Sequence, residues 1–542
     1  MTQNQRRGSE LPSQTNSPIT MLHLDILREI FLSNADIFVE TKALEITRRS
    51  SQVCHAWRTL ILNSPTIWGR LLDLSALARS TERWKEEVLN RSGNSLLWVC
   101  GRASGCLTHS RLGTEFFYRI LGAHWERIQH LSIIITDLPF DEQLWRPLLK
   151  PAPYLQSLLV VPLKLRREYL FSTANSSTPA TPLFSNHAPM LRDFSTQGVA
   201  FSLTSPWLSH LRNLRLSLSF SVSEILDALH SIPSLMTLTI SADKQRPLVS
   251  TSLSSVTLAN LTSLNLNDIW LPNVTQFLTH IRPSDGCSLF CTSEFSSNVN
   301  EDLQALPQPL SGWFQNYLRN HHVTALHLDF GSAGFWIYDN TSHTDIDLVF
   351  RMVVTRPAMQ PLPLDSYDFF PSSFSSCDFS TVTQLTMTIP HLPPSSFTAF
   401  TPLFSSFPSV TDLSADEQTI FAILSSPIFT ENAEAAEPSP LFFPLLQTLR
   451  THGLEERHPD SGASNDYVRP LLRFLRTRVA FGVPILTLDI GEISQWADLD
   501  MTSLEEMAGL LVMWYTNDEY FNYTCGSGKP ESLLFTATGV DF

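Results

Sequence analysis

Apolar residues near the start of the chain recur at helical spacing. In the segment "MLHLDILREIF", residues 21–31, five of them fall at positions i, i+4, i+5, i+8 and i+9: Leu22, Ile26, Leu27, Ile30 and Phe31. This spacing lines one face of a helix with apolar side chains. Asp25 would lie in the first turn, where a carboxylate suits the partial positive charge of a helix N-terminus.

Two further helices are predicted directly after this one. One covers "ETKALEITRR", residues 40–49, and the other covers "SSQVCHAWRTLIL", residues 50–62. The apolar face of the second comprises Val53, Trp57, Leu60 and Ile61. Because proline cannot continue a helix without losing a hydrogen bond, Pro65 is expected to stop the chain there. Trp68 would then fold back and close a small core.

Periodicity alone leaves two roles open for these three helices. Their apolar face could pack only against the rest of the chain, as a cap. It could instead stay available to a partner, because a unit of about 50 residues buries too little apolar surface to be stable alone.

A different pattern, Leu-x-x-Leu-x-Leu, recurs along the remainder and predicts short strands with alternating buried positions. The clear copies are "LQSLLV" (155–160), "LRNLRL" (211–216), "LMTLTI" (235–240) and "LTSLNL" (261–266). The weaker copies are "IQHLSI" (128–133), "VTALHL" (323–328), "VTQLTM" (382–387), "VTDLSA" (410–415), "LQTLRT" (446–451) and "ILTLDI" (485–490).

The spacing of these copies indicates a repeat. The central leucines Leu214, Leu238 and Leu264 follow one another at nearly equal steps, and these steps lie within the period of leucine-rich repeats. The next steps, to Leu326 and then to Leu385, are more than twice as long, and each could contain a degenerate repeat plus an insertion. No single repeat buries its own apolar face, so such repeats stack. The alternative is an ordinary α/β domain in which the pattern reflects leucine richness alone.

Segments rich in Ser and Pro, or in acidic residues, interrupt this pattern and are predicted to be loops. They cover residues 172–189, 306–312, 365–379 and 430–440. Near the C-terminus, residues 500–515 begin with the spacing of a capping box, Ser503 to Glu506, and then turn strongly apolar. We expect this last segment to cap the end of the stack.

Composition narrows the class of protein. The 542-residue chain is 43% hydrophobic, enough for a large core, and its net charge of −15 repels phosphate backbones, so no nucleic-acid partner is expected. Residues 1–20 are polar, which predicts a disordered tail and no signal peptide. No apolar run approaches about 18 residues, so no membrane partner is expected. Seven scattered cysteines indicate reduced thiols, in the cytoplasm or nucleus.

Motifs that carry chemistry are not found. "TCGSGKP", residues 524–530, has Tyr523 where a phosphate loop needs its first glycine, and Pro530 where it needs Ser or Thr. Cys287 and Cys291 have no second Cys/His pair at metal-binding distance. We therefore expect no catalytic residues, no cofactor and no metal. An unrecognised hydrolase would need nucleophilic or acidic residues that converge only in the fold.

Residues 22–31, followed by "VCHAWRTL" and "SPTIW", resemble the F-box of large fungal F-box-like families. Those families typically read Leu-Pro-x-Glu-Ile-Leu-x-x-Ile-Phe, then Val-Cys-x-x-Trp-Arg-x-Leu, then Pro-x-Leu-Trp. The resemblance covers residues 21–70, and "WKEEVLNRSGNSLLWV" also looks like the segment that follows the F-box there. His23 takes the place of the usual proline and Asp25 that of the usual glutamate.

Together, composition, repeat and resemblance predict an α/β protein in three parts: a disordered tail over 1–20, a small all-α F-box of three helices over 21–70, and an irregular leucine-rich-repeat solenoid with inserted loops over 71–542. The resemblance itself covers only the second part. It implies a substrate receptor that docks the Skp-family adaptor of a cullin–RING (SCF-type) ubiquitin ligase, and an unknown protein target. The implied adaptor-binding residues are Leu22, Ile26, Leu27, Ile30, Phe31, Val53, Trp57 and Leu60. The alternative is a non-ligase repeat scaffold whose F-box-like helices pack intramolecularly.

Overall fold

The chain forms two compact units, Met1–Leu211 and Arg212–Phe542, in a computed structural model. The structure describes residues 22–535 apart from residues 105–107, 137–141, 163–181, 197–200, 218–219, 242–252, 296–298, 332–333, 342–348, 356–368, 390–393, 426–440, 453–467, 494–498 and 517–518. The predicted N-terminal tail over residues 1–20 lies outside the described part.

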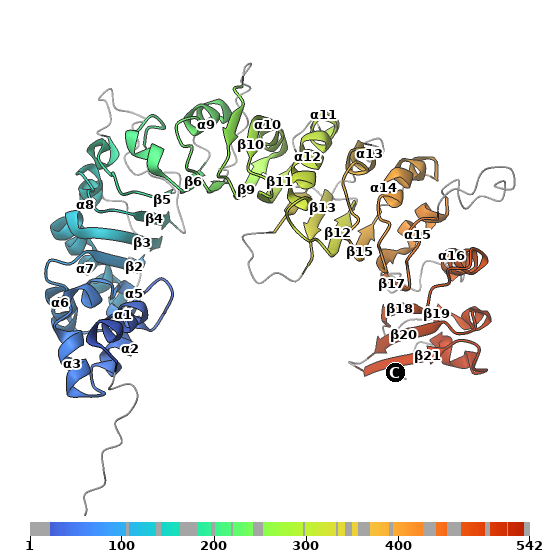
Figure 1. Ribbon diagram of the computed structural model, residues 1–542, viewed down its shortest axis with the longest axis horizontal. Helices are drawn as coiled ribbons and strands as arrows, with labels where there is room; N and C mark the ends of the chain where they lie inside the picture. The colour runs from blue at the N-terminus through green and yellow to red at the C-terminus, as the bar shows by residue number, and fades with distance from the viewer. Residues whose placement is uncertain are drawn as a thin grey trace, which may run out of the picture. The chain divides into compact units, whose positions relative to one another are not determined.

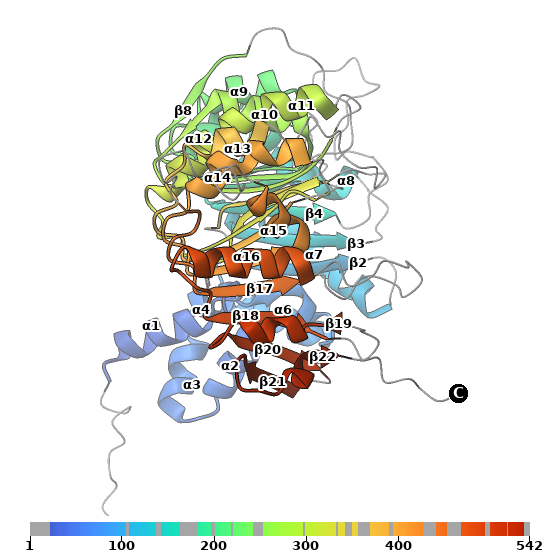
Figure 2. The same ribbon diagram turned by 90° about the vertical axis from the view of Figure 1, so that its right-hand side faces the viewer.

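Short helices open the first unit, and Figure 2 shows them gathered at one end of it. They are α1 Leu24–Asn34, α2 Ala43–Ser50, α3 His55–Leu62 and α4 Pro65–Gly69. The three predicted helices are present, and each starts somewhat later than predicted. The expectation that Pro65 stops the chain is wrong. Pro65 begins α4 instead, at the first helical position, where its missing N–H would have no intrahelical partner anyway.

A parallel sheet follows in the first unit, with strands side by side in chain order (Figure 1). Its strands are β1 Leu72–Asp73, β2 Leu97–Ser104, β3 Ile128–Thr136, β4 Ser157–Pro162 and β5 Asp193–Thr196. Each strand contributes one buried residue that lies in register with the buried residue of the next strand. These residues are Leu72, Val99, Leu131, Leu158 and Phe194. The helices between strands are α5 Leu74–Leu77, α6 Glu82–Arg91, α7 Thr108–His124 and α8 Glu142–Trp145.

The second unit begins in the same way. Its first strands are β6 Asn213–Ser217, β7 Thr237–Ser241, β9 Ser263–Trp270 and β11 Ser288–Glu294, again parallel and in chain order. Leu289 lies in register with Leu264, so the long step from Leu264 to Leu326 contains an additional strand, as predicted. Helices α9 Val222–Leu229 and α10 Leu271–His280 each follow a strand.

The order of strands then reverses. Strand β12, Ala325–Asp329, pairs with β15, Gln384–Thr388, and Leu326 lies directly beside Leu385. The long step from Leu326 to Leu385 therefore contains no repeat strand between them, because its described residues return toward β11. They form β13 Gly334–Asp339 and β14 Arg351–Thr355, and the order of strands in the sheet is β11-β14-β13-β12-β15.

Chain order resumes after β15. The remaining strands are β16 Asp412–Asp416, β17 Thr448–His452, β18 Thr487–Glu492, β20 Leu511–Thr516 and β21 Glu519–Thr524, of which only β21 is antiparallel to its described neighbour. Two small pairs, β8 Val256–Leu258 with β10 Ile281–Pro283 and β19 Leu499–Asp500 with β22 Leu534–Phe535, lie apart from this sheet.

All ten strands predicted from the Leu-x-x-Leu-x-Leu pattern are confirmed. In every one the central leucine is buried and in register with its parallel neighbour, for instance Leu385, Leu413, Leu449 and Leu488. The protein is therefore α/β with a mostly parallel sheet, and the described strands close no barrel. No helix in the described part is long and apolar enough to cross a membrane.

Helices line one face of the second unit's sheet (Figure 1). Besides α9 and α10 they are α11 Val299–Ala305, α12 Pro307–Leu318, α13 Phe369–Phe374, α14 Thr401–Ser405, α15 Glu417–Leu424 and α16 Val468–Ala480. Large aromatic side chains fill the space beneath them, as where the rings of Phe314 and Phe350 lie 4.5 Å apart.

Two of the loops predicted in the second unit contain helices instead, and the segment expected to cap the stack ends the described sheet as strands. Residues 307–312 begin helix α12 because Pro307 occupies its first position and apolar residues recur behind it. Residues 369–374 form α13, and Phe374 and Phe379 are buried. Residues 502–506 form only a short 3-10 helix, and the apolar run behind them is strand β20. The predicted loop at 430–440 lies outside the described residues, as does the first part of the one at 172–189.

Candidate partner-docking site on the first three helices

Helix α1 presents two different apolar surfaces. Leu27 and Phe31, one turn apart, are 5% and 3% exposed and pack into the unit. Ile26 and Ile30, also one turn apart, are 51% and 41% exposed. Because successive helical residues are about 100° apart, each isoleucine borders the buried stripe without entering it.

The start of α1 is capped by the residue that stands in place of the usual F-box proline. His23 has φ −62° and ψ 145°, and its carbonyl accepts the N–H of Leu27 at 3.1 Å. Its ring Nδ1 accepts the N–H of Asp25 at 3.4 Å. A proline ring restricts φ to a narrow range that includes the value at His23, so the backbone here already has the conformation that proline would impose.

Helix α3 is joined to α1 through aromatic contact. The rings of Phe31 and Trp57 meet edge to face, 5.0 Å apart. Helix α3 begins at His55, so Val53 precedes the helix and is 64% exposed. Cys54 caps the helix with its Sγ, which accepts the N–H of Trp57 at 3.5 Å. As a capping residue, Cys54 is exposed.

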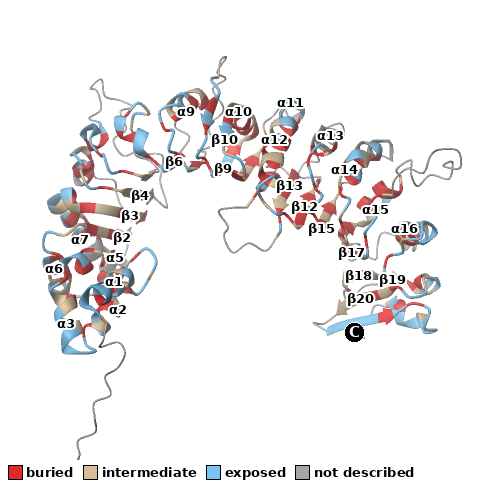
Figure 3. Cartoon of the chain, in the orientation of Figure 1, coloured by how far each residue is buried: buried red, intermediate tan, exposed pale blue. Residues whose placement is uncertain are grey.

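The eight predicted contact residues therefore divide into three groups. Two are core residues, Leu27 and Phe31. Three are partly exposed, Leu22, Trp57 and Leu60. Three are exposed, Ile26, Ile30 and Val53. Figure 3 colours the residues of α3 as a mixture of exposed, intermediate and buried.

Sequence reasoning missed three exposed apolar residues beside them: Leu24, Phe38 and Val39. Leu24 is out of phase with the predicted face of α1. Phe38 and Val39 belong to the apolar run Ile37–Val39 in the link between the first two helices, and this run was the available signal. The ring of Phe38 also contacts Trp98 on β2 at 5.8 Å, so it is partly held by the sheet.

Exposed apolar side chains concentrate in this part of the chain. Of the large hydrophobic side chains that are exposed among the described residues, about a third lie between Leu24 and Val53, a small fraction of the chain. Scattered exposed hydrophobic residues are ordinary, so this concentration makes the first helices the candidate for a partner-docking site.

A buried tryptophan fixes these helices to the rest of the unit. The Trp68 ring on α4 is 1% exposed, and its Nε1–H donates to the carbonyl of Ile61 on α3 at 2.8 Å. It meets Trp84 on α6 edge to face at 6.3 Å, and the guanidinium of Arg91 lies 4.7 Å from its centroid. Helix α4 therefore joins α3 to α6.

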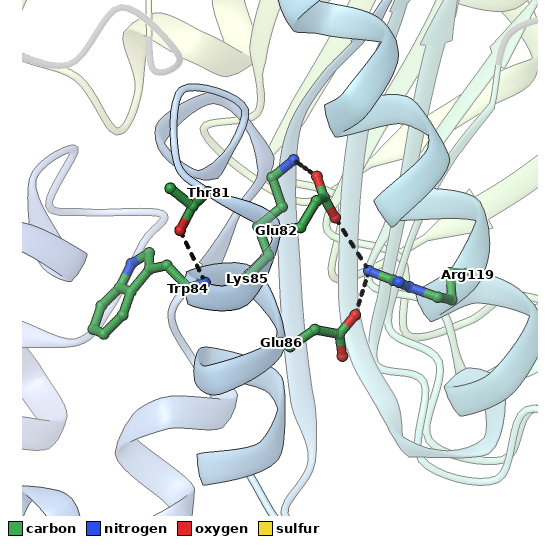
Figure 4. Close-up of polar contacts among 6 residues, drawn as sticks. All are labelled: Thr81, Glu82, Trp84, Lys85, Glu86 and Arg119. Atoms are coloured by element: carbon green, nitrogen blue, oxygen red, sulfur yellow. Dashed lines mark hydrogen bonds and ion pairs between the residues drawn. The ribbon is translucent and has the colours of Figure 1, made fainter.

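Helix α6 is in turn tied to α7 by charged side chains (Figure 4). Arg119 on α7 lies 2.7 Å from a carboxylate oxygen of Glu86 and 3.8 Å from one of Glu82. The buried Lys85 ammonium donates to Glu82 at 2.6 Å, and Thr81 caps the helix. The helices that carry the exposed residues are thus connected through α4 and α6 to α7.

Chemistry of another kind finds no support in the described residues. No group of three His, Cys, Asp or Glu side chains among them is placed to hold a metal ion. Burial raises the pKa of Cys287 to about 12, which keeps that thiol protonated. In the segment 524–530, the N–H of Gly528 donates to Glu505 at 2.8 Å, so a carboxylate occupies the place where a phosphate loop would hold its anion.

No protein-family model matches the chain, and no curated protein matches it in sequence. The assignment of this site therefore rests on the residues and contacts described above.

Proposed function

We propose that the protein is the substrate-recognition subunit of a cullin–RING ubiquitin ligase of the SCF type. Helices α1 and α3, with the turns beside them, dock a Skp-family adaptor and through it a cullin. The sheet and its helices act as an irregular leucine-rich-repeat solenoid that binds a target protein. The protein itself performs no chemistry, and it works where such ligases work, in the cytoplasm or nucleus.

The observation that carries this proposal is the exposure of Ile26 and Ile30 beside the buried Leu27 and Phe31. An apolar helix face that needs no partner would turn both sets inward, because exposed isoleucine forgoes the free energy of burial. Docking of a helix against a partner's groove uses such a face, with apolar anchors at i and i+4.

The alternative, a scaffold whose F-box-like helices pack intramolecularly, predicts buried isoleucines at these positions. Intramolecular packing does account for Leu27, Phe31 and Trp68. It leaves Ile26, Ile30 and Val53 without a role, and we therefore favour the ligase receptor.

A titration of the full chain with a purified Skp-family adaptor tests the proposal. Ile26→Asp places a charge in the proposed interface and should weaken binding at least about thirtyfold, the effect of losing a buried anchor residue. Leu486→Asp is the matched control, because Leu486 is 53% exposed, almost the same as Ile26, and lies in the second unit. Trp57→Ala is less informative, since Trp57 also holds α3 to Phe31.

Two outcomes would refute the proposal. One is the absence of binding by a wild-type chain whose circular dichroism shows it to be folded. The other is equal binding by wild type and Ile26→Asp. Either result would favour the scaffold.

A further inference from the structure

One face of the second unit's sheet carries side chains that are half-buried. Where the strand order reverses, this face bears a row of aromatic and basic side chains. Phe290 on β11, Arg351 on β14, Tyr338 on β13 and His327 on β12 are neighbours in register across four strands. Their strand neighbours along the chain, such as Met352 and Ile337, point to the opposite face and are buried. We call these four residues the arginine–aromatic row.

Two rings define the position of the Arg351 guanidinium. Its Cζ lies 5.7 Å from the ring centroid of Phe290 and 6.0 Å from that of Tyr338. The imidazole of His327 stacks on Tyr338, with 4.3 Å between centroids and 14° between planes. A guanidinium beside aromatic rings keeps the N–H donors at its edge directed outward.

Those donors are unused within the described part of the chain. Arg351 is an exposed residue, and it makes no hydrogen bond or ion pair with any described residue. Arg119 and Arg476, by contrast, each pair with a glutamate. An arginine that is positioned but unpaired is suited to a bidentate acceptor from another molecule.

The charge of Arg351 itself favours an acidic acceptor. None of the four residues of the row is acidic, and the carboxylate that acts on Tyr338 is that of Asp329, two residues beyond His327 on the same face of β12. Within the row, Arg351 supplies the permanent positive charge, in a chain of net charge −15. Because screening limits charge interactions to about 8–10 Å, the local charge decides what binds here.

We propose that the arginine–aromatic row binds a carboxylate of an acidic segment in a partner protein. Arg351 would donate two parallel N–H bonds to an Asp or Glu side chain, and Phe290 and Tyr338 would shield these bonds from water. Under the proposed function, this partner is the ligase target. Only this identification of the partner rests on the proposed function. Binding of the acidic segment itself requires no adaptor.

Selection from a random dodecapeptide library on the full chain tests the proposal. Selected peptides should be enriched in Asp and Glu, and Arg351→Gln should abolish this enrichment. Arg319→Gln is the matched control, since it removes the same charge from an exposed residue that follows α12. A labelled copy of the most enriched acidic peptide should then bind Arg351→Gln at least about tenfold more weakly, as expected for losing a charge-assisted pair. Arg351→Lys should recover part of this loss.

Three results would overturn the proposal: no enrichment of acidic residues, equal enrichment with Arg351→Gln, or equal losses in the Arg351 and Arg319 variants. The same binding measurement is repeated with a copy of the enriched acidic peptide in which phosphoserine replaces each Glu. If only that copy binds, the row recognises phosphate and the carboxylate assignment is wrong. Adaptor titration of the same preparations separates the two proposals, because it reports on the first three helices alone.

Discussion

The ring of Phe31 on α1 lies edge to face against the ring of Trp57 on α3, 5.0 Å away between centroids. Its chain neighbour Ile30 remains 41% exposed. One step along the helix thus separates a residue that holds two helices together from a residue that is free to bind a partner.

This division predicts different effects from two adjacent truncations. Leu27→Ala should lower the local stability of α1 to α3 by about 2–4 kcal/mol, because it leaves a cavity in a packed core. Ile26→Ala should change it by no more than about 0.5 kcal/mol, because the side chain is half exposed. Native-state hydrogen exchange of the amides in these helices measures both. Equal effects would mean that α1 does not have two separate apolar surfaces.

The helix start predicts a stabilising substitution. His23→Pro should raise the protection of the α1 amides by about 0.4–1 kcal/mol, since φ is already −62° and proline restricts the unfolded chain. Hydrogen exchange of the Leu27 and Arg28 amides measures this change in protection. A fall in protection would instead show that the imidazole's bond to the N–H of Asp25 contributes more than the backbone restriction.

Buried Arg478 on α16 predicts a large loss on truncation. Its guanidinium donates to the carbonyls of Val483, Phe442, Phe443 and Leu446 at 3.0–3.2 Å and is fully buried. Burial lowers its pKa to about 10, so it stays charged at neutral pH. Arg478→Met should destabilise the second unit by at least about 3 kcal/mol, because it removes charge-assisted bonds and leaves buried carbonyls without donors.

Arg476, two residues earlier, is the control for that experiment. It pairs with Glu506 at 2.6 Å, but both side chains are largely exposed, so Arg476→Met should cost less than about 1 kcal/mol. Urea unfolding followed by circular dichroism compares the two variants. Similar midpoints would mean that the four carbonyls find other donors.

Asp329 on β12 predicts a dependence of stability on pH. Burial, and then the charge of Asp416, raise its pKa to about 6, and no described group bonds its Oδ1. Between about pH 4 and pH 6 the folded chain therefore holds a proton that the unfolded chain has lost, so this residue's contribution to stability falls as pH rises through that window. The loss is limited to about 1 kcal/mol because the carboxyl is partly exposed.

Asp329→Asn should remove this contribution to the dependence of stability on pH. Urea midpoints of both chains at pH 4 and pH 7 give the test, with the variant gaining relative to wild type at pH 7. An unchanged difference between the two chains at both pH values would contradict the raised pKa.

The strands and the exposed residues differed in how far sequence could predict them. Ten strand cores were predictable because each carries a central leucine that packs against its counterpart in the next strand, so pattern and register have the same cause. The reversed order of β13 and β14 was not predictable from the sequence, because it depends on which strands far apart in the sequence pair. The exposure of Ile26 was likewise hidden, because Ile26 and Leu27 are both apolar and only packing against α3 and α4 distinguishes them.

The reversed strand order also bears on how the second unit unfolds. Strands β11 and β12 share no pairing among their described residues, so the sheet hydrogen bonds that link the first four strands to those from β12 onward pass through β13 and β14. At Gly334 a Cβ would collide with the carbonyl oxygen of Val354, so the hairpin closes only with glycine there. Opening of this one hairpin would divide the sheet into two parts and leave an unpaired strand edge on each of them.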